Sequence, residues 1–122
     1  MPIVDIELVC PKGEEIPKPL ANSLADTLGA VFAAPKGRVW VRLSRRAASL
    51  YAENGVMAHE TAHPVFVRVL HAHPPEGDAR KTEAAAIAQA VATCAERANA
   101  VVHVEYAPPG AGRVAFGGQL VE

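Results

Sequence analysis

The chain divides into two stretches, residues 1–62 and 63–122, that follow the same order of sequence patterns. Each begins with a proline, Pro2 or Pro64, directly before a run of apolar residues that is typical of a strand. Each continues with a loop containing proline, a helical pattern, a second apolar run and a turn containing glycine. This repeat predicts a single domain over residues 1–122, made of two similar units of strand, helix and strand.

In the first half, the expected elements are a strand at residues 3–9, a helix that begins near Pro17 or Pro19 and ends before Pro35, and a strand at residues 39–43. The helix is indicated by one apolar stripe, formed by Leu20, Leu24, Leu28 and Val31. The segment from Arg45 to Gly55 fits either a single helical turn or a loop that leads to a short hairpin at Asn54 and Gly55.

In the second half, the expected elements are a strand at residues 65–70, a helix at residues 78–98, a strand at residues 101–106 and a closing hairpin at residues 113–120. Asp78 is the predicted N-cap, because its carboxylate can accept hydrogen bonds from the free amides at a helix start. The order of elements therefore matches that of the first half.

The fold class that follows is α/β (α+β), because the strands of a β-α-β unit are parallel and their connecting helix covers one face. Two fused units can form a four-stranded mixed sheet with both helices on the same side. The opposite face is then bare, and alternation along the strands places on it Trp40, Arg42, Phe66, Arg68, His103 and Glu105. Aromatic rings, arginines and a histidine are poorly suited to open water together, so we expect another subunit to cover this face.

Proline in the second position has a chemical consequence, since a small second residue normally allows the initiator methionine to be removed. Pro2 would then carry a free secondary amine, and an α-amino group ordinarily titrates at about 7.7–8.0. Burial or a neighbouring cation lowers this pKa, so the amine can serve as a base near neutral pH, held still by the strand behind it. The alternative is that Pro2 merely starts a strand, where its missing N–H does no harm.

Composition limits the partners and the compartment. The formal net charge of −1 gives no reason to expect nucleic acid or an anionic membrane as a partner. The two cysteines, Cys10 and Cys94, argue against a disulfide scaffold and mildly for a reducing compartment. No signal peptide or long apolar span is recognisable, so a cytoplasmic location is expected.

Two histidine patterns suggest metal sites. Residues His59–His63 fit H-E-x-x-H, which on a helix presents two zinc ligands and a glutamate base. Pro64 disfavours helical geometry at His63, so a zinc peptidase is not favoured. His71 and His73 have the spacing of two ligands on one strand face, but no third ligand is evident. We therefore expect neither a metal nor a cofactor.

The amino-terminal proline, the repeat and the carboxyl-terminal segment together resemble the tautomerase superfamily. That group includes 4-oxalocrotonate tautomerase, 5-carboxymethyl-2-hydroxymuconate isomerase and macrophage migration inhibitory factor. The specific marks are Met1-Pro2-Ile3, Ala34-Pro35 before the returning strand, and Phe116-Gly117-Gly118-Gln119-Leu120, which is similar to the glycine-glycine-glutamate-leucine ending of short members. Long members fuse two units and form trimers, so the resemblance implies a homotrimer.

The resemblance also implies roles for individual residues. Pro2 matches the catalytic base, whereas Pro64 is locked in an amide and has no basic nitrogen. The first-loop arginine of short members matches Lys12, and the arginine on their returning strand matches Trp40, or His103 in the second half. Arg42, on the same face as Trp40, is the expected substitute for the missing arginine.

Further matches come from the hairpin of the short members and from the long members. The hairpin aromatic residue matches Tyr51. A tyrosine and an asparagine that enter from the neighbouring subunit match His103 and Glu105, and an isoleucine near the pocket matches His73. The candidate substrate-binding residues are thus Lys12, Trp40, Arg42, Tyr51, His73, His103 and Glu105. Packing or interface roles are the alternative for Tyr51, Arg42 and the pair His103 and Glu105.

The expected function is that of a cofactor-independent tautomerase, an isomerase that moves a proton between keto and enol forms of a small carbonyl or 2-hydroxy-dienoate acid. Pro2 would be the general base, and cations, chiefly Arg42 and Lys12, would hold the carboxylate of this small-molecule substrate. One alternative is a hydratase, dehalogenase or decarboxylase that uses a protonated proline. Another is a non-catalytic binding protein similar to macrophage migration inhibitory factor.

Overall fold

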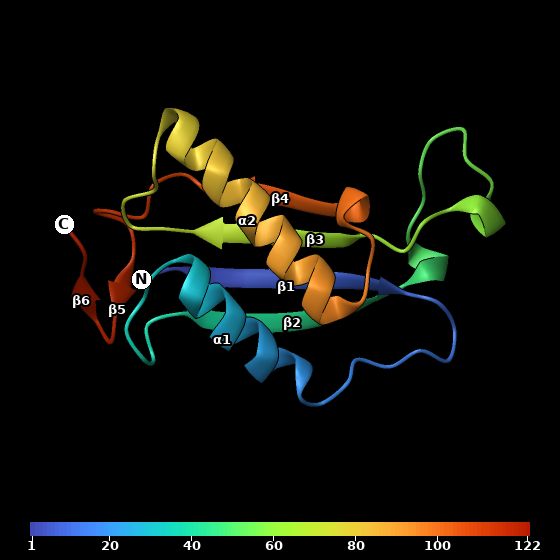
Figure 1. Ribbon diagram of the computed structural model, residues 1–122, viewed down its shortest axis with the longest axis horizontal. Coiled ribbons are helices and arrows are strands. Elements are labelled where there is room, and N and C mark those ends of the chain that lie inside the picture. The colour runs from blue at the N-terminus through green and yellow to red at the C-terminus, as the bar shows by residue number, and fades with distance from the viewer.

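The computed structural model describes all residues from Met1 to Glu122. Its elements are, in order, β1 (Ile3–Cys10), α1 (Leu20–Val31), β2 (Trp40–Ala47), η1 (Ala48–Leu50), η2 (Ala58–Glu60), β3 (Val65–Leu70), α2 (Gly77–Ala95), η3 (Asn99–Val101), β4 (Val102–Tyr106), β5 (Ala115–Phe116) and β6 (Gln119–Leu120), where η marks a 3₁₀ turn. Both α-helices lie on the same face of the main sheet (Figure 1). Neither is long and apolar enough to cross a membrane.

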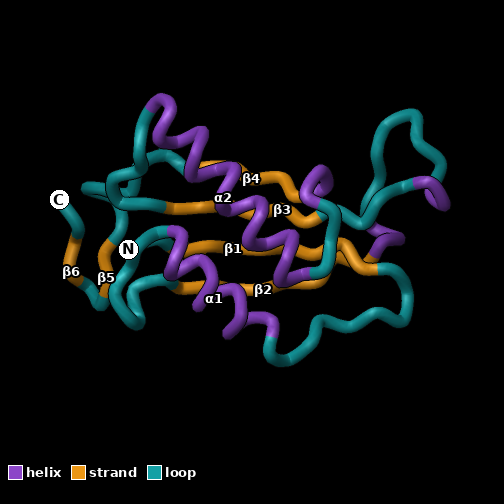
Figure 2. The backbone as a smooth tube through the Cα atoms, in the orientation of Figure 1, coloured by secondary structure: helices purple, strands orange, loops and turns teal.

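The main sheet joins the two halves through their first strands. Its strand order is β2-β1-β3-β4. Each β-α-β unit contributes a parallel pair, β1 with β2 and β3 with β4, while the central pair β1 and β3 is antiparallel. The predicted four-stranded mixed sheet with both helices on one side is therefore confirmed, and Figure 2 shows the long loops that connect its strands.

The core lies between the sheet and the two helices. The central strands have no edge exposed to solvent, and their inward side chains are fully buried. The helices add an apolar stripe each, because residues three and four apart share one face. The principal core residues are Val4, Ile6 and Leu8 of β1, Val65, Val67 and Val69 of β3, Leu20, Leu24 and Leu28 of α1, and Ile87 and Val91 of α2.

The other face of the sheet carries polar and aromatic side chains, as alternation predicts. On β3, Val65, Val67 and Val69 are buried while Phe66 and Arg68 between them are exposed. Cross-strand partners on this face are also paired in the structure, since Arg68 bonds to Glu105 and the ring of Phe66 contacts that of His103. The expected bare face is thus confirmed for one chain.

The segment after β2 differs in part from expectation. The strand continues to Ala47, because β1 stays paired with it through Cys10 opposite Ala47. A single 3₁₀ turn follows, as one alternative predicted, and Asn54 and Gly55 then form a turn in a loop. The alternative of a hairpin there is wrong, because no strand flanks the turn between the end of β2 at Ala47 and the start of β3 at Val65.

The second helix, α2, also begins and ends at other residues than the sequence predicts. The prediction of Asp78 as N-cap is wrong, since the N-cap is Glu76, the helix starts at Gly77 with a φ of 57°, and Asp78 lies in its first turn. The helix ends at Ala95 rather than Ala98, because Glu96 adopts the left-handed conformation. This change of direction lets Arg97 donate hydrogen bonds to two backbone carbonyls at the end of β1 and before β3, those of Val9 and His63.

The carboxyl-terminal hairpin lies beside the end of the main sheet at which β1 begins (Figure 1). Its strands, β5 and β6, pair with each other and not with the main sheet. Gly117 and Gly118 both have positive φ values, 59° and 84°, which the tight two-residue turn requires. The ring of Phe116 stacks on Trp40 at a centroid distance of 4.8 Å, and this contact attaches the hairpin to β2.

Candidate active site

Pro2 stands at the amino-terminal end of β1. Its side chain is fully buried, whereas Met1 is about half exposed. The carbonyl of Pro2 accepts a hydrogen bond from the backbone amide of Trp40 at 3.1 Å, so the first residue before β1 is fixed to β2. With Met1 in place the nitrogen of Pro2 belongs to an amide, and removal of Met1 would expose a secondary amine at a rigid position.

A pocket of about 380 Å³ opens directly beside this position, on the face of the sheet opposite the helices. Ile3, the residue after Pro2, lines it. The remaining lining residues are Asp5, Arg42, Arg68, Leu70, Ala107, Pro108, Pro109, Gly110, Arg113 and Val114. The pocket thus combines apolar walls with three guanidinium groups and one carboxylate, which is suitable for a small anion.

The charged floor of the pocket is part of a row that crosses all four strands. In the sheet register Arg42 of β2 lies opposite Asp5 of β1, Asp5 opposite Arg68 of β3, and Arg68 opposite Glu105 of β4. Arg42 donates two hydrogen bonds to Asp5, at 2.5 and 2.7 Å, and Arg68 lies 3.1 Å from Glu105. The row alternates in sign, so each charge has opposite neighbours.

The ion pair with Asp5 also affects the titration of Arg42. The hydrogen bond and the negative charge of Asp5 raise the pKa of the Arg42 guanidinium above its usual value. Arg113, by contrast, lines the pocket and forms no ion pair. Since the row of four is balanced, Arg113 supplies the excess positive charge, and it is the cation most available to a bound carboxylate.

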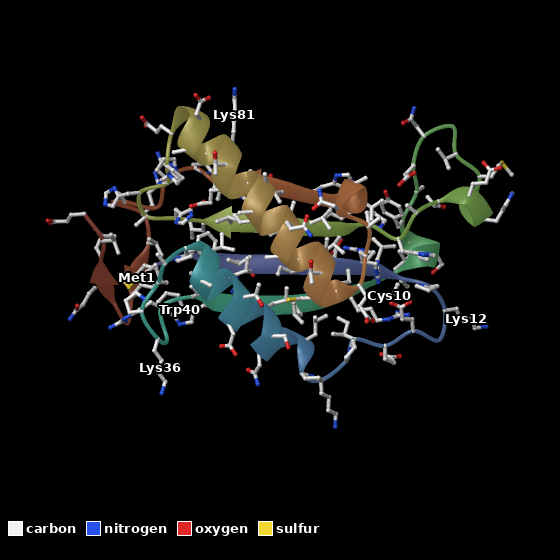
Figure 3. The ribbon with its side chains drawn as sticks, viewed as in Figure 1. Met1, Cys10, Lys12, Lys36, Trp40 and Lys81 are labelled. Atoms are coloured by element: carbon white, nitrogen blue, oxygen red, sulfur yellow. The ribbon has the colours of Figure 1, made fainter.

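Four of the predicted site residues lie at the same end of the molecule as Pro2. Arg42 lines the pocket. Glu105 does not line it, but forms an ion pair with Arg68, which does. Trp40 lies opposite Ile3 in the sheet, beside Met1 (Figure 3). His73 follows β3 in sequence, but its Nε2 lies 2.8 Å from the carbonyl oxygen of Glu122, and it does not line the pocket.

The other predicted residues lie away from Pro2 within one chain. Lys12 is at the opposite end of β1 from Met1 (Figure 3), and a strand of this length spans roughly 25 Å. Tyr51 follows η1 and contacts Phe66, whose ring in turn contacts His103. The hydroxyl of Tyr51 donates to Glu53 at 2.5 Å, and this bond, with burial as a lesser cause, raises its pKa to about 12.

The two histidine patterns do not form ligand arrangements. Within His59–His63 only a single 3₁₀ turn is present, and it ends at Glu60 before an extended Thr61, so the helix that H-E-x-x-H requires is missing. β3 ends at Leu70, so His71 and His73 are not on a strand face, and they bond to different partners, Glu83 and Glu122. No three potential ligands are clustered as for a metal.

The sequence did not identify three lining residues as part of the site: Asp5, Arg68 and Arg113. Arg68 had a usable signal, because alternation places it on the same face as Arg42. Asp5 had the same signal on β1. Arg113 lies in the turn after β4, and no periodicity assigns the direction of a loop residue.

Comparisons with known proteins show the fold. No family model matches the chain, and no curated protein matches it. Among solved structures, a fused 4-OT described as a symmetric trimer has a TM-score of 0.75 at 16% identity, over 98% of this chain and 94% of that one. Pt0534 inactivated by 2-oxo-3-pentynoate has a TM-score of 0.74 at 18% identity, over 98% and 94%.

A macrophage migration inhibitory factor from Oncomelania hupensis is also similar, with a TM-score of 0.72 at 17% identity, over 100% of this chain and 83% of that one. The fold that the sequence predicts is therefore confirmed over nearly the whole chain. Identities this low do not carry an activity from one protein to another.

Proposed function

We propose that this protein is a cofactor-independent tautomerase, in which the free amine of Pro2 moves a proton between the keto and enol forms of a small carbonyl or 2-hydroxy-dienoate acid. The observation that carries the proposal is the pocket, which begins at Ile3, directly after Pro2, and is lined by Arg42, Arg68 and Arg113. A base beside an anion-binding pocket is what proton transfer on a carbonyl acid needs.

The base would work in its neutral form. Its nitrogen accepts a proton from the carbon or oxygen of the substrate and returns it to another atom of the same molecule, so no other reactant is consumed. The buried position of Pro2 and the nearby guanidinium groups disfavour the protonated amine. We therefore expect an amine pKa below the ordinary value of about 7.7–8.0.

The arginines would divide two tasks. Arg113, without an ion pair, would bind the substrate carboxylate, and Arg42 and Arg68 would stabilise negative charge on the enolate oxygen while remaining paired with their acids. Arg42 therefore keeps the binding role expected for it. Lys12, the other expected cation, is too far from Pro2 to act within one chain.

A homotrimer would explain the residues that lie far from Pro2. The bare sheet face and the exposed side chains of Leu50, Met57 and Phe66 favour burial against another copy. In such an assembly Lys12, Tyr51 and His103 of one subunit would approach Pro2 of the next. Light scattering should give the mass of three chains, and a stable monomer at micromolar concentration would contradict this assembly.

The direct test is a substrate screen with pH profiles, on protein whose loss of Met1 has been established by intact mass. Phenylenolpyruvate, 2-hydroxymuconate and halogenated acrylates cover the enol acids and the main alternative. A tautomerase predicts turnover of an enol acid that rises with pH and survives chelators. Turnover of a halogenated acid that grows as the pH falls would instead indicate a protonated proline and a hydratase or dehalogenase.

A covalent probe extends the test where the substrate is unknown. 2-Oxo-3-pentynoate inactivates Pt0534, whose fold this chain shares. It is a carboxylate with an electron-poor triple bond, so a neutral amine can add to the bond while its proton passes to carbon. We expect it to bind through the arginines and to react at Pro2. If no substrate is turned over and the probe does not react at Pro2, the result favours a non-catalytic binding protein. The cytoplasmic location stays a prediction.

A further inference from the structure

Behind one wall of the pocket, on the helix side of the sheet, a carboxylate joins α2 to the ends of two strands. Glu83 Oε1 accepts a hydrogen bond from the hydroxyl of Tyr106 at 2.8 Å and lies 2.9 Å from Nε2 of His71. The side chains of His71 and Glu83 are only 11% and 17% exposed. A single oxygen thus connects the helix to residues at the carboxyl ends of β3 and β4.

His71 and Tyr106 are both directly adjacent in sequence to residues of the pocket wall. His71 follows Leu70, and Tyr106 precedes Ala107, and both Leu70 and Ala107 line the pocket. Ile3 is paired with Leu70 in the antiparallel ladder. That pair is the last of the ladder, and Pro2 and His71 are the residues directly beyond it, so the cluster lies at the end of β3 that is paired with the start of β1.

The loop that carries Arg113 is attached to this same segment. The amide of Ala107 bonds to the carbonyl of Val69 at 2.8 Å, and the amide of Gly110 bonds to the carbonyl of His71 at 2.8 Å. The amide of Arg113 bonds in turn to the carbonyl of Gly110 at 2.7 Å. A continuous series of hydrogen bonds therefore runs from Glu83 through His71 and Gly110 to Arg113.

The close fit of this loop explains why Gly110 has no side chain. A Cβ at this position would lie 2.9 Å from a methyl carbon of Val114 and 3.3 Å from the carbonyl oxygen of His71. These contacts are too short for a substituted residue without movement of the loop. The position of the pocket loop is therefore closely tied to the position of His71.

The hydrogen bonds of the cluster have one consistent arrangement. Burial, and then the bond to Glu83, raises the pKa of Tyr106, so its phenol remains a donor. An ionised carboxylate can only accept, so His71 contributes its Nε2–H. The rings of Phe32 and His71 pack at right angles with their centroids 5.0 Å apart, and the Arg80 guanidinium lies 5.6 Å from the centre of the Tyr106 ring. Both donors are thereby held in place.

We propose that Glu83 is a positioning residue of the Pro2 site, which fixes the ends of β3 and β4 and thereby the wall and loop that present Arg113 to a bound anion. The structural part of this proposal stands by itself, and its effect on reactivity rests on the proposed function of Pro2. Glu83 itself does not line the pocket beside Pro2.

The structural part is tested by amide hydrogen exchange. In Glu83→Ala the amides of Ala107 and Gly110 should exchange roughly tenfold faster, because the wall loses its attachment to α2. Glu83→Gln should restore most of the protection, since its carbonyl oxygen still accepts both bonds. The control is Asp78→Ala, which removes a fully exposed carboxylate from the same helix and should leave these amides unchanged.

The effect on reactivity is tested with 2-oxo-3-pentynoate as the probe. Glu83→Ala should raise the half-saturating probe concentration about fivefold or more, while the limiting rate and the pH profile stay close to those of the wild type. Tyr106→Phe removes one of the two hydrogen bonds, so its half-saturating probe concentration should lie between those of the wild type and Glu83→Ala. It replaces Glu83→Ala in this test if that variant does not fold.

The outcomes separate the two proposals. Native exchange at Ala107 and Gly110 in a folded Glu83→Ala or Tyr106→Phe variant overturns the positioning role, whatever the probe does. Faster exchange with an unchanged half-saturating concentration overturns the link to anion binding. A wild-type protein whose Pro2 does not react contradicts the proposed function instead, and exchange alone then decides the role of Glu83.

Discussion

The two halves of the sheet carry the same ion pair in opposite order. In the first half the acid, Asp5, is on the central strand and the arginine, Arg42, on the outer one; in the second half Arg68 is central and Glu105 is outer. Because the central strands are antiparallel and Asp5 lies opposite Arg68, the reversal produces alternating charges across four strands. The same order in both halves would have placed like charges opposite each other at the centre. Similar units have thus become complementary ones.

The two prolines that precede the central strands, Pro2 and Pro64, have similar surroundings but different chemistry. Pro2 and Pro64 are both fully buried, both precede a central strand, and the carbonyl of each accepts a backbone hydrogen bond, from Trp40 at 3.1 Å and from Val9 at 3.0 Å. Their surroundings are alike, and their chemistry differs only because one can become a chain end. The substitutions below break this likeness between the halves, beginning with the largest expected effect.

Substitution of the two prolines should separate chemistry from structure. Pro2→Ala leaves a primary amine at the same place, and we expect turnover of any enol substrate to fall about 10²–10⁴-fold, the usual value of a general-base step. Pro64→Ala should leave turnover unchanged and lower stability by about 1–3 kcal/mol, through the loss of buried ring atoms and greater freedom of the unfolded chain. Steady-state kinetics and denaturant unfolding measure both. Equal losses of activity would refute the assignment of the base to Pro2.

Arg97 marks a second difference, because only the second helix is followed directly by a cation whose side chain is largely shielded from solvent. Its guanidinium donates to the carbonyls of Val9 and His63 and to Glu14 Oε1, and it is 11% exposed. Arg97→Ala leaves these acceptors without a partner and should lower the free energy of unfolding by about 2–4 kcal/mol. Lys81→Ala, at an exposed position of the same helix, should change it by less than about 0.5 kcal/mol. Similar values for both variants would show that Arg97 does not join the halves.

The pocket arginines test how the halves share the site. Arg113→Ala should raise the half-saturating concentration of a carboxylate substrate or probe about 10–100-fold, because Arg113 has no competing acid. Arg42→Ala should have a smaller effect, since Asp5 already occupies its guanidinium. Arg46→Ala is the matched control, on the same strand and paired with Glu7, outside the pocket. An effect at Arg46 as large as at Arg113 would show that only overall charge matters.

The smallest effect concerns two tyrosines, one from each half. Hydrogen bonding to Glu53 raises the pKa of Tyr51 to about 12, and burial with bonding to Glu83 raises that of Tyr106. A raised folded pKa gives stability that is present below the unfolded value of about 10 and is lost as the pH rises through the folded value. The free energy of unfolding should therefore fall above about pH 10. It should fall less steeply in Tyr106→Phe, which lacks one of the two phenols. Tyr51→Phe should stay closer to the wild type, because the hydroxyl of Tyr51 is more exposed. If the phenolate absorbance of both tyrosines rises near pH 10, their pKa values are not raised and the prediction is wrong.

Much of the fold could be predicted because its signals are local. The leucine stripe and Pro19 placed α1 correctly, and strand alternation assigned Phe66 and Arg68 to the bare face before any partner was known. The end of α2 could not be predicted in this way. It depends on Arg97 reaching carbonyls on another strand, and such long-range contacts leave no periodic pattern.

The site was predictable to a lesser extent. The chain start and alternation indicated Pro2 and Arg42 as candidates, and the pocket is lined by Arg42 and by Ile3, the residue after Pro2. Arg113 and the loop around Gly110 were not found, because turns have no fixed side-chain direction. Residue matching to relatives also brought together Lys12 and Pro2, which stand at opposite ends of β1 in one chain. Only an assembly of several copies can unite them.

The most direct test of a reactive Pro2 is to map the site of 2-oxo-3-pentynoate addition. The chain should be incubated with the probe, digested, and analysed by mass spectrometry, beside a sample that retains Met1. We predict a single adduct on the nitrogen of Pro2 in the chain that lacks Met1, faster at higher pH, and none where Met1 remains. Adducts on Cys10, Cys94 or lysines alone, or equal labelling with Met1 retained, would contradict the claim that Pro2 is the reactive base.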